Sequence, residues 1–188
     1  MKQTIADAAD SVLVVVDYQP VLLDIMEGSE LIIDRACFLI EAAAALNVPI
    51  LATEQNPRRM GGSHPSIAHA LNEAGVEPVA KMSFSCCGNL AFMDALKDTW
   101  RKNVVLIGIE SHICLAQTAL QLRELDYDVI ACVDAMASRT KDRHQLGLER
   151  IQQAGGALAH SESIVYEWME TCEHEAFKTV LGIVKAHP

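Results

Sequence analysis

Six short apolar runs, each about the length of one β-strand, constrain the fold of this chain more than any other feature. They are residues 11–17, 48–55, 77–82, 103–110, 128–135 and 157–163. Their hydrophobicity is continuous rather than alternating, which is typical of strands covered on both faces in a parallel sheet. Helical patterns separate the runs, at about 29–46, 65–74, 89–101, 112–126, 141–154, 163–171 and 173–186. This alternation predicts a three-layer α/β/α sandwich with a six-stranded, mostly parallel sheet.

Length and charge narrow the class of protein. The 188 residues suffice for one hydrophobic core, and no repeat or long linker divides them, so we expect a single domain over residues 1–188. The formal net charge of −10 argues against nucleic acid or a membrane surface as the partner and favours a small-molecule substrate. Asp7 and Asp10 interrupt any signal-peptide-like apolar start, so we expect a cytoplasmic protein.

The cysteines do not form the pattern of a disulfide framework. The chain has six of them and no C-x-x-C pair, so reduced thiols are expected. Cys86 and Cys87 are adjacent in the sequence, and adjacent cysteines do not form a disulfide easily. We interpret this pair as structural or as part of a pocket wall rather than as a redox or metal site.

Three polar residues follow strand candidates at positions where parallel sheets place their ligand-binding crevice. Asp17 closes the first run, Lys81 lies at the end of the third, and Cys114 begins the helix after the fourth. Taken singly, each has an ordinary explanation: a turn cap, a lysine that extends to solvent, or a buried helix cysteine. A thiol at a helix start is also exposed to N–H groups that favour the thiolate. Together the three residues indicate one site.

The motifs around these residues resemble the isochorismatase-like cysteine hydrolases, which include nicotinamidases, N-carbamoylsarcosine amidohydrolases and isochorismatases. The resemblance runs from "VVVDYQ" to "KTVLGIVK" and is strongest in "LVVVDYQ", "KMSFSCCG" and "VVLIGIESHICLAQTALQL". It is closest to the isochorismatase-domain-containing proteins, a branch whose natural substrate is generally unassigned. The resemblance implies a Rossmann-like fold of the isochorismatase type and a catalytic triad of Asp17, Lys81 and Cys114.

The resemblance also implies a role for each member of the triad. Cys114 would attack an electrophilic carbon, Asp17 would take the thiol proton and pass it to the leaving group, and Lys81 would hold the carboxylate and stabilise the thiolate. A cis peptide bond is implied between Ile109 and Glu110. The backbone N–H groups of Glu110 and Cys114 would then form the oxyanion hole.

The sequence departs from the nicotinamidase branch at its metal site. That branch carries an Asp-x-His motif after the second strand, whereas this chain has "TEQNPRRMGGSHPSI". His64 and His69 are five residues apart, which does not align them on one helix face. We therefore expect no catalytic metal and no cofactor, and nicotinamidase activity becomes less favoured.

His112 is the obvious rival to Asp17 as the base for Cys114. Residues two apart on a helix point about 200° away from each other, so we place His112 at the pocket mouth or in a subunit contact instead. The other expected pocket residues are Tyr18, Gln55, Phe84 and Ile109. Arg58 and Arg59 could bind an anionic group, although solvated loop charges explain them as well.

The C-terminal pattern predicts two amphipathic helices with Trp168 and Met169 exposed enough to be buried elsewhere, either on the chain's own sheet or against a second copy. Because oligomers are also common in the resembled family, we expect at least a homodimer. The leading functional hypothesis is a metal-independent hydrolase of small amides or related C–N or C–O substrates that forms a thioester-like intermediate on Cys114. The alternatives are a non-catalytic binding or scaffold protein on the same fold, and a redox-responsive cysteine protein.

Overall fold

The sheet in the computed structural model contains six strands, and every pair of neighbours is parallel. The structure describes residues 5–188. The strands are β1 (Ser11–Val16), β2 (Ile50–Gln55), β3 (Val79–Lys81), β4 (Asn103–Ile109), β5 (Asp128–Ala137) and β6 (Ala157–Ala159). All six predicted strands are therefore confirmed, and the sheet is entirely rather than mostly parallel.

The strand order is β3-β2-β1-β4-β5-β6. From β1 the chain builds outward to β2 and β3, then returns to the middle and builds outward the other way through β4, β5 and β6. The direction therefore reverses between β1 and β4. Ligands in open α/β sheets bind at this kind of switch point, at the carboxyl ends of the strands.

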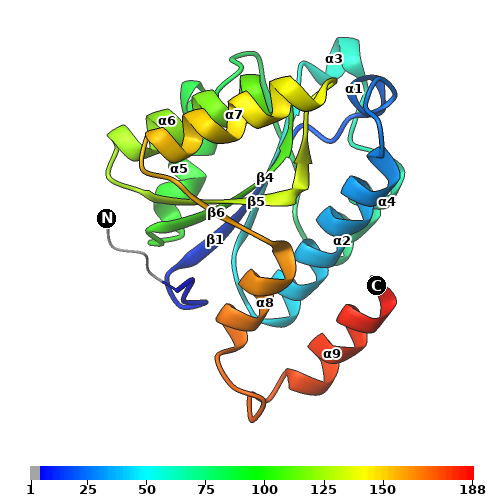
Figure 1. Ribbon diagram of the computed structural model, residues 1–188, viewed down its shortest axis with the longest axis vertical. Helices are drawn as coiled ribbons and strands as arrows, with labels where there is room; N and C mark the ends of the chain where they lie inside the picture. The colour runs from blue at the N-terminus through cyan, green and yellow to red at the C-terminus, as the bar shows by residue number, and fades with distance from the viewer. Residues whose placement is uncertain (1–4) are drawn as a thin grey trace.

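Helices cover both faces of the sheet, as Figure 1 shows. They are α1 (Pro20–Leu23), α2 (Ser29–Ala45), α3 (Pro57–Met60), α4 (Pro65–Glu73), α5 (Leu90–Asp98), α6 (Ala116–Glu124), α7 (Lys141–Gln153), α8 (Ser161–Met169) and α9 (Phe177–Ala186). A 3₁₀ turn, η1 (Cys86–Gly88), precedes α5, and a π-helical turn, η2 (Ser111–Leu115), precedes α6.

Side chains that alternate along the central strands enter two separate cores. Leu13 and Val15 of β1 belong to the core under α2, α4 and α8. Val12, Val14 and Val16 belong to the core under α5, α6 and α7. Because both faces of β1 are buried, its apolar run has no polar side, which explains the continuous hydrophobicity of the sequence.

A glycine allows β4 to approach β1 closely beside the switch point. Gly108 has φ +138°, and a Cβ there would lie 2.3 Å from the carbonyl oxygen of Val16. Only glycine fits this position. The register between β4 and β5 also shifts between Leu106 and Gly108, so the last residues of β4 are set locally rather than by regular pairing.

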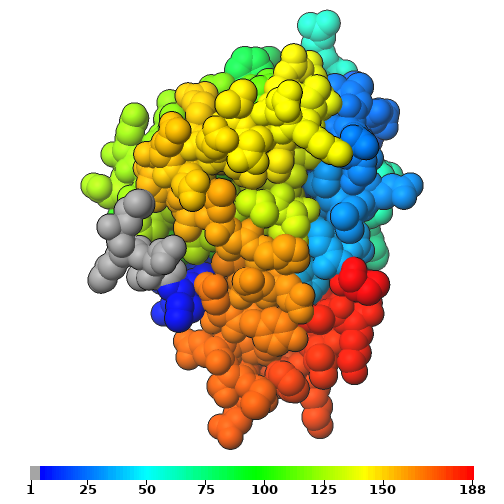
Figure 2. Space-filling view, in the orientation of Figure 1, coloured from blue at the N-terminus to red at the C-terminus, as the bar shows by residue number. Residues whose placement is uncertain are grey.

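The C-terminal region differs from the sequence prediction at the end of the sixth strand. The sixth strand ends at Ala159, and α8 begins at Ser161, whose N–H and hydroxyl both donate to the Asp134 carboxylate. Trp168 and Met169 are each only 2% exposed, because they pack in the chain's own core. Of the two possibilities, burial within the chain itself is therefore the one that the structure shows. In Figure 2, α8 and α9 form the lower end of the molecule.

None of the helices within residues 5–188 combines the length and the hydropathy needed to cross a bilayer.

Candidate active site

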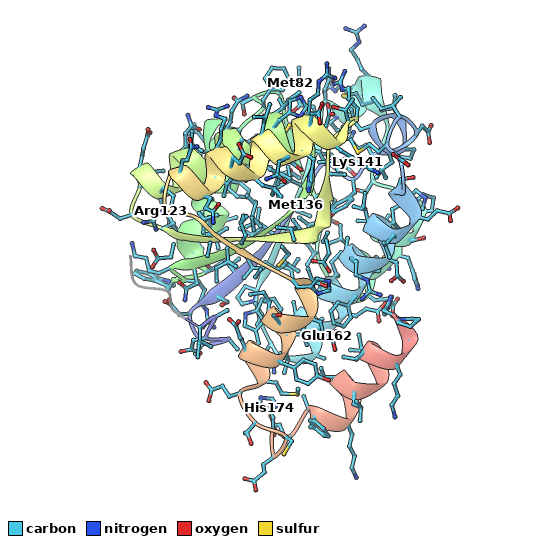
Figure 3. The ribbon with its side chains drawn as sticks, viewed as in Figure 1. Met82, Arg123, Met136, Lys141, Glu162 and His174 are labelled. Carbon is cyan, nitrogen blue, oxygen red and sulfur yellow. The ribbon has the colours of Figure 1, made fainter. Side chains whose placement is uncertain are left out.

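The predicted triad residues meet at the carboxyl edge of the sheet, beside the β1/β4 switch point. Asp17 follows β1, Lys81 ends β3, and Cys114 lies in η2 after β4. In Figure 3, Met82, which directly follows β3, and Lys141, which follows β5, lie toward the upper end of the molecule. The upper end is therefore the carboxyl edge that carries the site.

A buried ion pair forms the base of the site. The Nζ of Lys81 lies 2.6 Å from Oδ2 of Asp17, and both side chains are 0% exposed. The hydroxyl of Thr53 donates to the other Asp17 oxygen at 2.9 Å. Asp17 adopts φ 58°, in the left-handed region that Asp tolerates better than most residues. The backbone thus turns sharply as it leaves β1.

The Lys81 ammonium is fully occupied by oxygen acceptors. Besides Asp17, it donates to Oε1 of Gln55 at 2.8 Å and to the carbonyls of Phe84 and Ser83 at 3.0 and 3.3 Å. Gln19 in turn accepts from the Gln55 N–H and donates to the Gln55 carbonyl. These contacts satisfy a charge that would otherwise be costly to bury.

Cys114 shares this environment but is held as a thiol. Burial, followed by the negative charge of Asp17, raises the pKa of Cys114 to about 12, although Lys81 acts in the opposite direction. This differs from the expectation that the helix start favours a thiolate, because burial and Asp17 outweigh that effect. Asp17 and the thiol are close enough for each to shift the pKa of the other. Burial raises the pKa of Asp17 itself despite Lys81.

The turn that carries Cys114 has unusual backbone geometry. The Ile109–Glu110 peptide bond is cis, and residues 111–115 form a π-helical turn rather than the first turn of a regular α-helix. The N–H groups of Ile113 and Leu115, on either side of Cys114, both donate to the Glu110 carbonyl, at 3.0 and 3.3 Å. Single π-turns occur frequently at functional sites.

A second ion pair lies at the same edge of the sheet. The Glu110 carboxylate accepts from the N–H and Nε of Arg139, each at 3.0 Å, and from its Nη2 at 2.5 Å. Burial works against ionisation of Glu110, but the hydrogen bonds from Arg139 outweigh it and lower the pKa of this carboxyl group. Glu110 therefore remains a carboxylate at neutral pH.

A small cavity of about 150 Å³ opens onto the thiol. Its lining residues are Leu22, Gln55, Met60, Phe84, Glu110, Ile113, Cys114 and Arg139. One part of this wall is apolar and the other carries hydrogen-bonding groups, which is the usual composition of a small-molecule site. Asp17 and Lys81, with no exposed side-chain surface, lie beneath the wall.

The structure places two of the five expected pocket residues on this cavity, Gln55 and Phe84. Tyr18 and Ile109 lie in the core on the other face of the sheet, and the Tyr18 hydroxyl donates to the Ala135 carbonyl. His112 is not in the cavity wall, and its Nδ1 lies 3.0 Å from Oγ of Ser138. The expectation that Tyr18, Ile109 and His112 line the pocket is therefore not met, because local packing turns each side chain toward other partners.

The remaining candidates from the sequence also lie outside the cavity wall. Arg58 and Arg59 are exposed on α3. Cys86 is buried against Oγ1 of Thr53 at 3.8 Å, and burial raises its pKa to about 11. Nδ1 of His64 caps α4 by accepting from Ser66. Within residues 5–188, no group of three or more His, Cys, Asp or Glu side chains is placed to hold a metal ion.

Sequence reasoning missed Thr53 and Arg139. Thr53 and Gln55 are polar residues two apart at the end of β2, so they share a face of this strand, and this was an available signal. Arg139 lies in a loop directly after β5, where only the three-dimensional arrangement pairs it with Glu110.

Comparison with solved structures finds proteins that share the fold over nearly the whole chain. A solved structure described as the MAR1 ribonuclease of Caenorhabditis elegans matches with a TM-score of 0.91 and 31% identity, covering 98% of this chain and 95% of that one. YcaC from Pseudomonas aeruginosa, with covalent acrylamide, matches at 21% identity with a TM-score of 0.89, covering 100% and 95% of the two chains, which shows the shared fold.

Protein sequences give the same relationship. The secreted isochorismatase effector Isc1 of Phytophthora sojae is 32% identical over 94% of this chain and 85% of its own length. Isochorismatase domain-containing protein 2A of Mus musculus is 34% identical over 82% of this chain and 72% of its own. The isochorismatase domain family matches residues 11–163. The chain therefore belongs to the isochorismatase domain family.

Proposed function

We propose that this protein is a metal-independent cysteine hydrolase that acts on a small amide or a related C–N or C–O substrate. The observation that carries the proposal is the position of the Cys114 thiol, which faces a cavity on one side and the buried Asp17–Lys81 pair on the other. A nucleophile within reach of a base that a third group orients is the general signature of covalent catalysis.

The raised pKa values of Cys114 and Asp17 fit a proton transfer between them. The thiol is neutral at rest, so it gives its proton to Asp17 as sulfur attacks the substrate carbonyl. Asp17 then passes this proton to the leaving nitrogen or oxygen as the bond to carbon breaks. Asp17 then deprotonates a water molecule, which attacks the resulting thioester. The C–S bond breaks, Asp17 returns the proton to the Cys114 sulfur, and the acid is released.

Lys81 and the backbone have supporting roles in this mechanism. Lys81 fixes the orientation of the Asp17 carboxylate and partly compensates its charge. The N–H groups of Glu110 and Cys114 would stabilise the negative oxygen that forms during attack. Removing one such donor typically costs about a hundredfold or more in turnover.

The cavity limits the substrate class. At about 150 Å³ it admits only a small group next to the thiol. Arg139 and Gln55 offer polar contacts on its wall, and Leu22, Met60 and Ile113 offer apolar ones. A small acyl group with one hydrogen-bond acceptor suits this combination.

The proposal is tested by screening small amides, ureas, esters and enol ethers for turnover. RNA is included because a relative is described as a ribonuclease. Cys114→Ala serves as the inactive variant, and replacement of the exposed Cys172 by alanine is the matched control. We expect turnover by the wild type and the control only. If Cys114→Ala retains turnover of a confirmed substrate, the mechanism is wrong, and if no class is hydrolysed, the scaffold alternative gains support.

The redox alternative is less well supported. A peroxide-sensing cysteine is typically a thiolate at neutral pH, whereas burial raises the pKa of Cys114 to about 12. Cys114 is the one cysteine among the residues that line the cavity described above.

We also propose that the protein forms a homo-oligomer. YcaC of Escherichia coli, which shares this fold at 21% identity, is described as an octameric hydrolase. Apolar side chains near the cavity are exposed: Val21 by 50%, Ile25 by 52%, Phe84 by 56% and Met82 by 72%. Light scattering coupled to size exclusion tests this proposal, and a monomeric mass at micromolar concentration would contradict it.

A further inference from the structure

Helix α7 packs directly on the backbone of the turn that carries Cys114. Gly147 marks the closest approach, because a Cβ at this position would lie 2.7 Å from the nitrogen of His112 and 2.7 Å from the carbonyl carbon of Ser111. Real Cβ atoms essentially never come this close to backbone atoms. Helix α7 and η2 therefore form one packed unit, with no side chain between them.

One helical turn before Gly147, a histidine reaches the same turn through a hydrogen bond. Nδ1 of His144 lies 2.8 Å from Oγ of Ser111, and this hydroxyl also lies 2.9 Å from the Ala137 carbonyl oxygen. A carbonyl oxygen can only accept, so the single hydroxyl proton goes to Ala137 and His144 must donate. Burial lowers the pKa of His144, so the ring is neutral at neutral pH and carries its proton on Nδ1.

The resulting chain of hydrogen bonds joins three elements at the nucleophile. It runs from α7 through Ser111 in η2 to Ala137, the last residue of β5, which pairs with Ile109 at the end of β4. Ser111 is fully buried and lies between Glu110 and Cys114 in the sequence. The hydroxyl contacts of Ser111 therefore fix the first residue of the turn that presents Cys114.

We infer that His144 is a positioning residue for the nucleophile: its Nδ1–H, acting through Ser111, holds η2 in the geometry that presents Cys114 to the cavity. The inference rests on the proposed role of Cys114 and deepens it, because it assigns control of the thiol to a residue outside the triad and outside the cavity wall. His144 acts through the turn and does not contact the reacting atoms.

The test measures the rate at which acrylamide alkylates Cys114, followed by peptide mass spectrometry, with the exposed Cys172 as an internal control thiol. His144→Leu removes the donor, and we expect the Cys114 rate to fall about tenfold, since small misplacement of reacting groups is costly. The amide nitrogen of an asparagine can take the place of Nδ1, so His144→Asn should stay within about twofold of the wild type. Gln145→Leu, on the exposed side of the same helix, is the matched control.

A double-mutant cycle separates positioning from general destabilisation. If His144 acts through Ser111, Ser111→Ala combined with His144→Leu should react no more slowly than the slower single variant. Equal rates for Cys114 in wild type and His144→Leu would overturn the inference, as would an asparagine variant that is folded but as slow as the leucine variant. A purely structural role would lower the melting temperature without changing the ratio of Cys114 to Cys172 rates.

This test does not depend on turnover. If Cys114→Ala retains hydrolysis, the proposed function fails, yet the alkylation rates still report whether His144 controls the thiol. If the alkylation rates are unchanged while Cys114→Ala is inactive, the proposed function stands and the role of His144 is rejected.

Discussion

The Asp17–Lys81 and Glu110–Arg139 pairs lie at the same edge of the sheet and differ in their access to water. Both side chains of the first pair are 0% exposed, whereas in the second Glu110 is 4% and Arg139 is 42% exposed. A charge pair without water is strongly coupled and costly to break. A pair with one solvated partner is screened and contributes less.

The two carboxyl groups respond to these surroundings in opposite directions. Burial raises the pKa of Asp17 even though Lys81 is bonded to it. Burial also acts on Glu110, but hydrogen bonds from Arg139 lower its pKa overall. Asp17 is thus suited to accept a proton during a reaction, whereas Glu110 remains ionised and holds the loop after β5 against the nucleophile turn.

The largest expected difference between the two pairs is in turnover. Asp17→Asn removes the base, and we expect kcat to fall by about 10²- to 10⁴-fold. Glu110→Gln keeps the backbone N–H and should lower kcat far less. The kcat values are compared on any substrate found in the screen, and circular dichroism verifies that both variants are folded. Similar losses of kcat for the two variants would contradict a catalytic role for Asp17 and a structural role for Glu110.

Stability should also separate the pairs. Lys81→Met leaves Asp17 buried without its partner, and we expect a loss of about 3 kcal/mol in the free energy of unfolding at pH 7, measured in urea. Without Lys81 the pKa of Asp17 rises further, so Asp17 is protonated more readily in the folded protein. The loss should therefore be smaller at pH 5 than at pH 7, and a loss independent of pH would argue against an ionised Asp17.

Arg139→Met should cost less, about 1 kcal/mol, because the guanidinium is partly exposed and only the buried Glu110 loses its partner. The lowered pKa of Glu110 contributes stability above its ordinary value of 4.5 that is lost as pH falls through the folded pKa. Urea unfolding at pH 7 and pH 3 should therefore show a smaller acid-induced loss in Arg139→Met than in wild type. An equal loss would mean that the pair is not formed in solution.

A smaller effect is expected at alkaline pH. Burial and Asp17 raise the pKa of Cys114 to about 12, whereas an unfolded thiol ionises at about 8.5. Above that pH, ionisation of this thiol lowers the free energy of the unfolded chain, so the free energy of unfolding falls, by about 0.8 kcal/mol at pH 9. Cys114→Ala should reduce the slope of stability against pH, and an unchanged slope would contradict the raised pKa.

Much of the fold could be predicted from the sequence because the central strands are buried on both faces. Residues such as Val14 and Val15 enter opposite cores, so their run carries no polar position and is easily recognised. The end of β6 was harder, because Ser161 is held at the start of α8 by Asp134 of β5, 27 residues earlier in the chain. The surface that covers Trp168 stayed open, because a helix pattern does not show which surface that will be.

The site was predictable in part for a similar reason. Parallel strands bring their carboxyl ends together, so the sequence alone brought Asp17, Lys81 and Cys114 to one edge. The pocket walls depend on side-chain direction at loops and turns, which has no periodic signal. Tyr18, next to Asp17, therefore lies in the core, and Arg139, which reasoning from the sequence did not select, lines the cavity.

The most direct test of a covalent mechanism is the mass of the protein during turnover. A reaction with a hydrolysed substrate is quenched in acid, and the peptide that contains Cys114 is analysed by mass spectrometry. We predict that this peptide carries the acyl group in the wild type, and that Cys114→Ala carries none and produces no acid. Turnover at the wild-type rate by Cys114→Ala, or an acyl group found only on another residue, would contradict the assignment of Cys114 as the nucleophile.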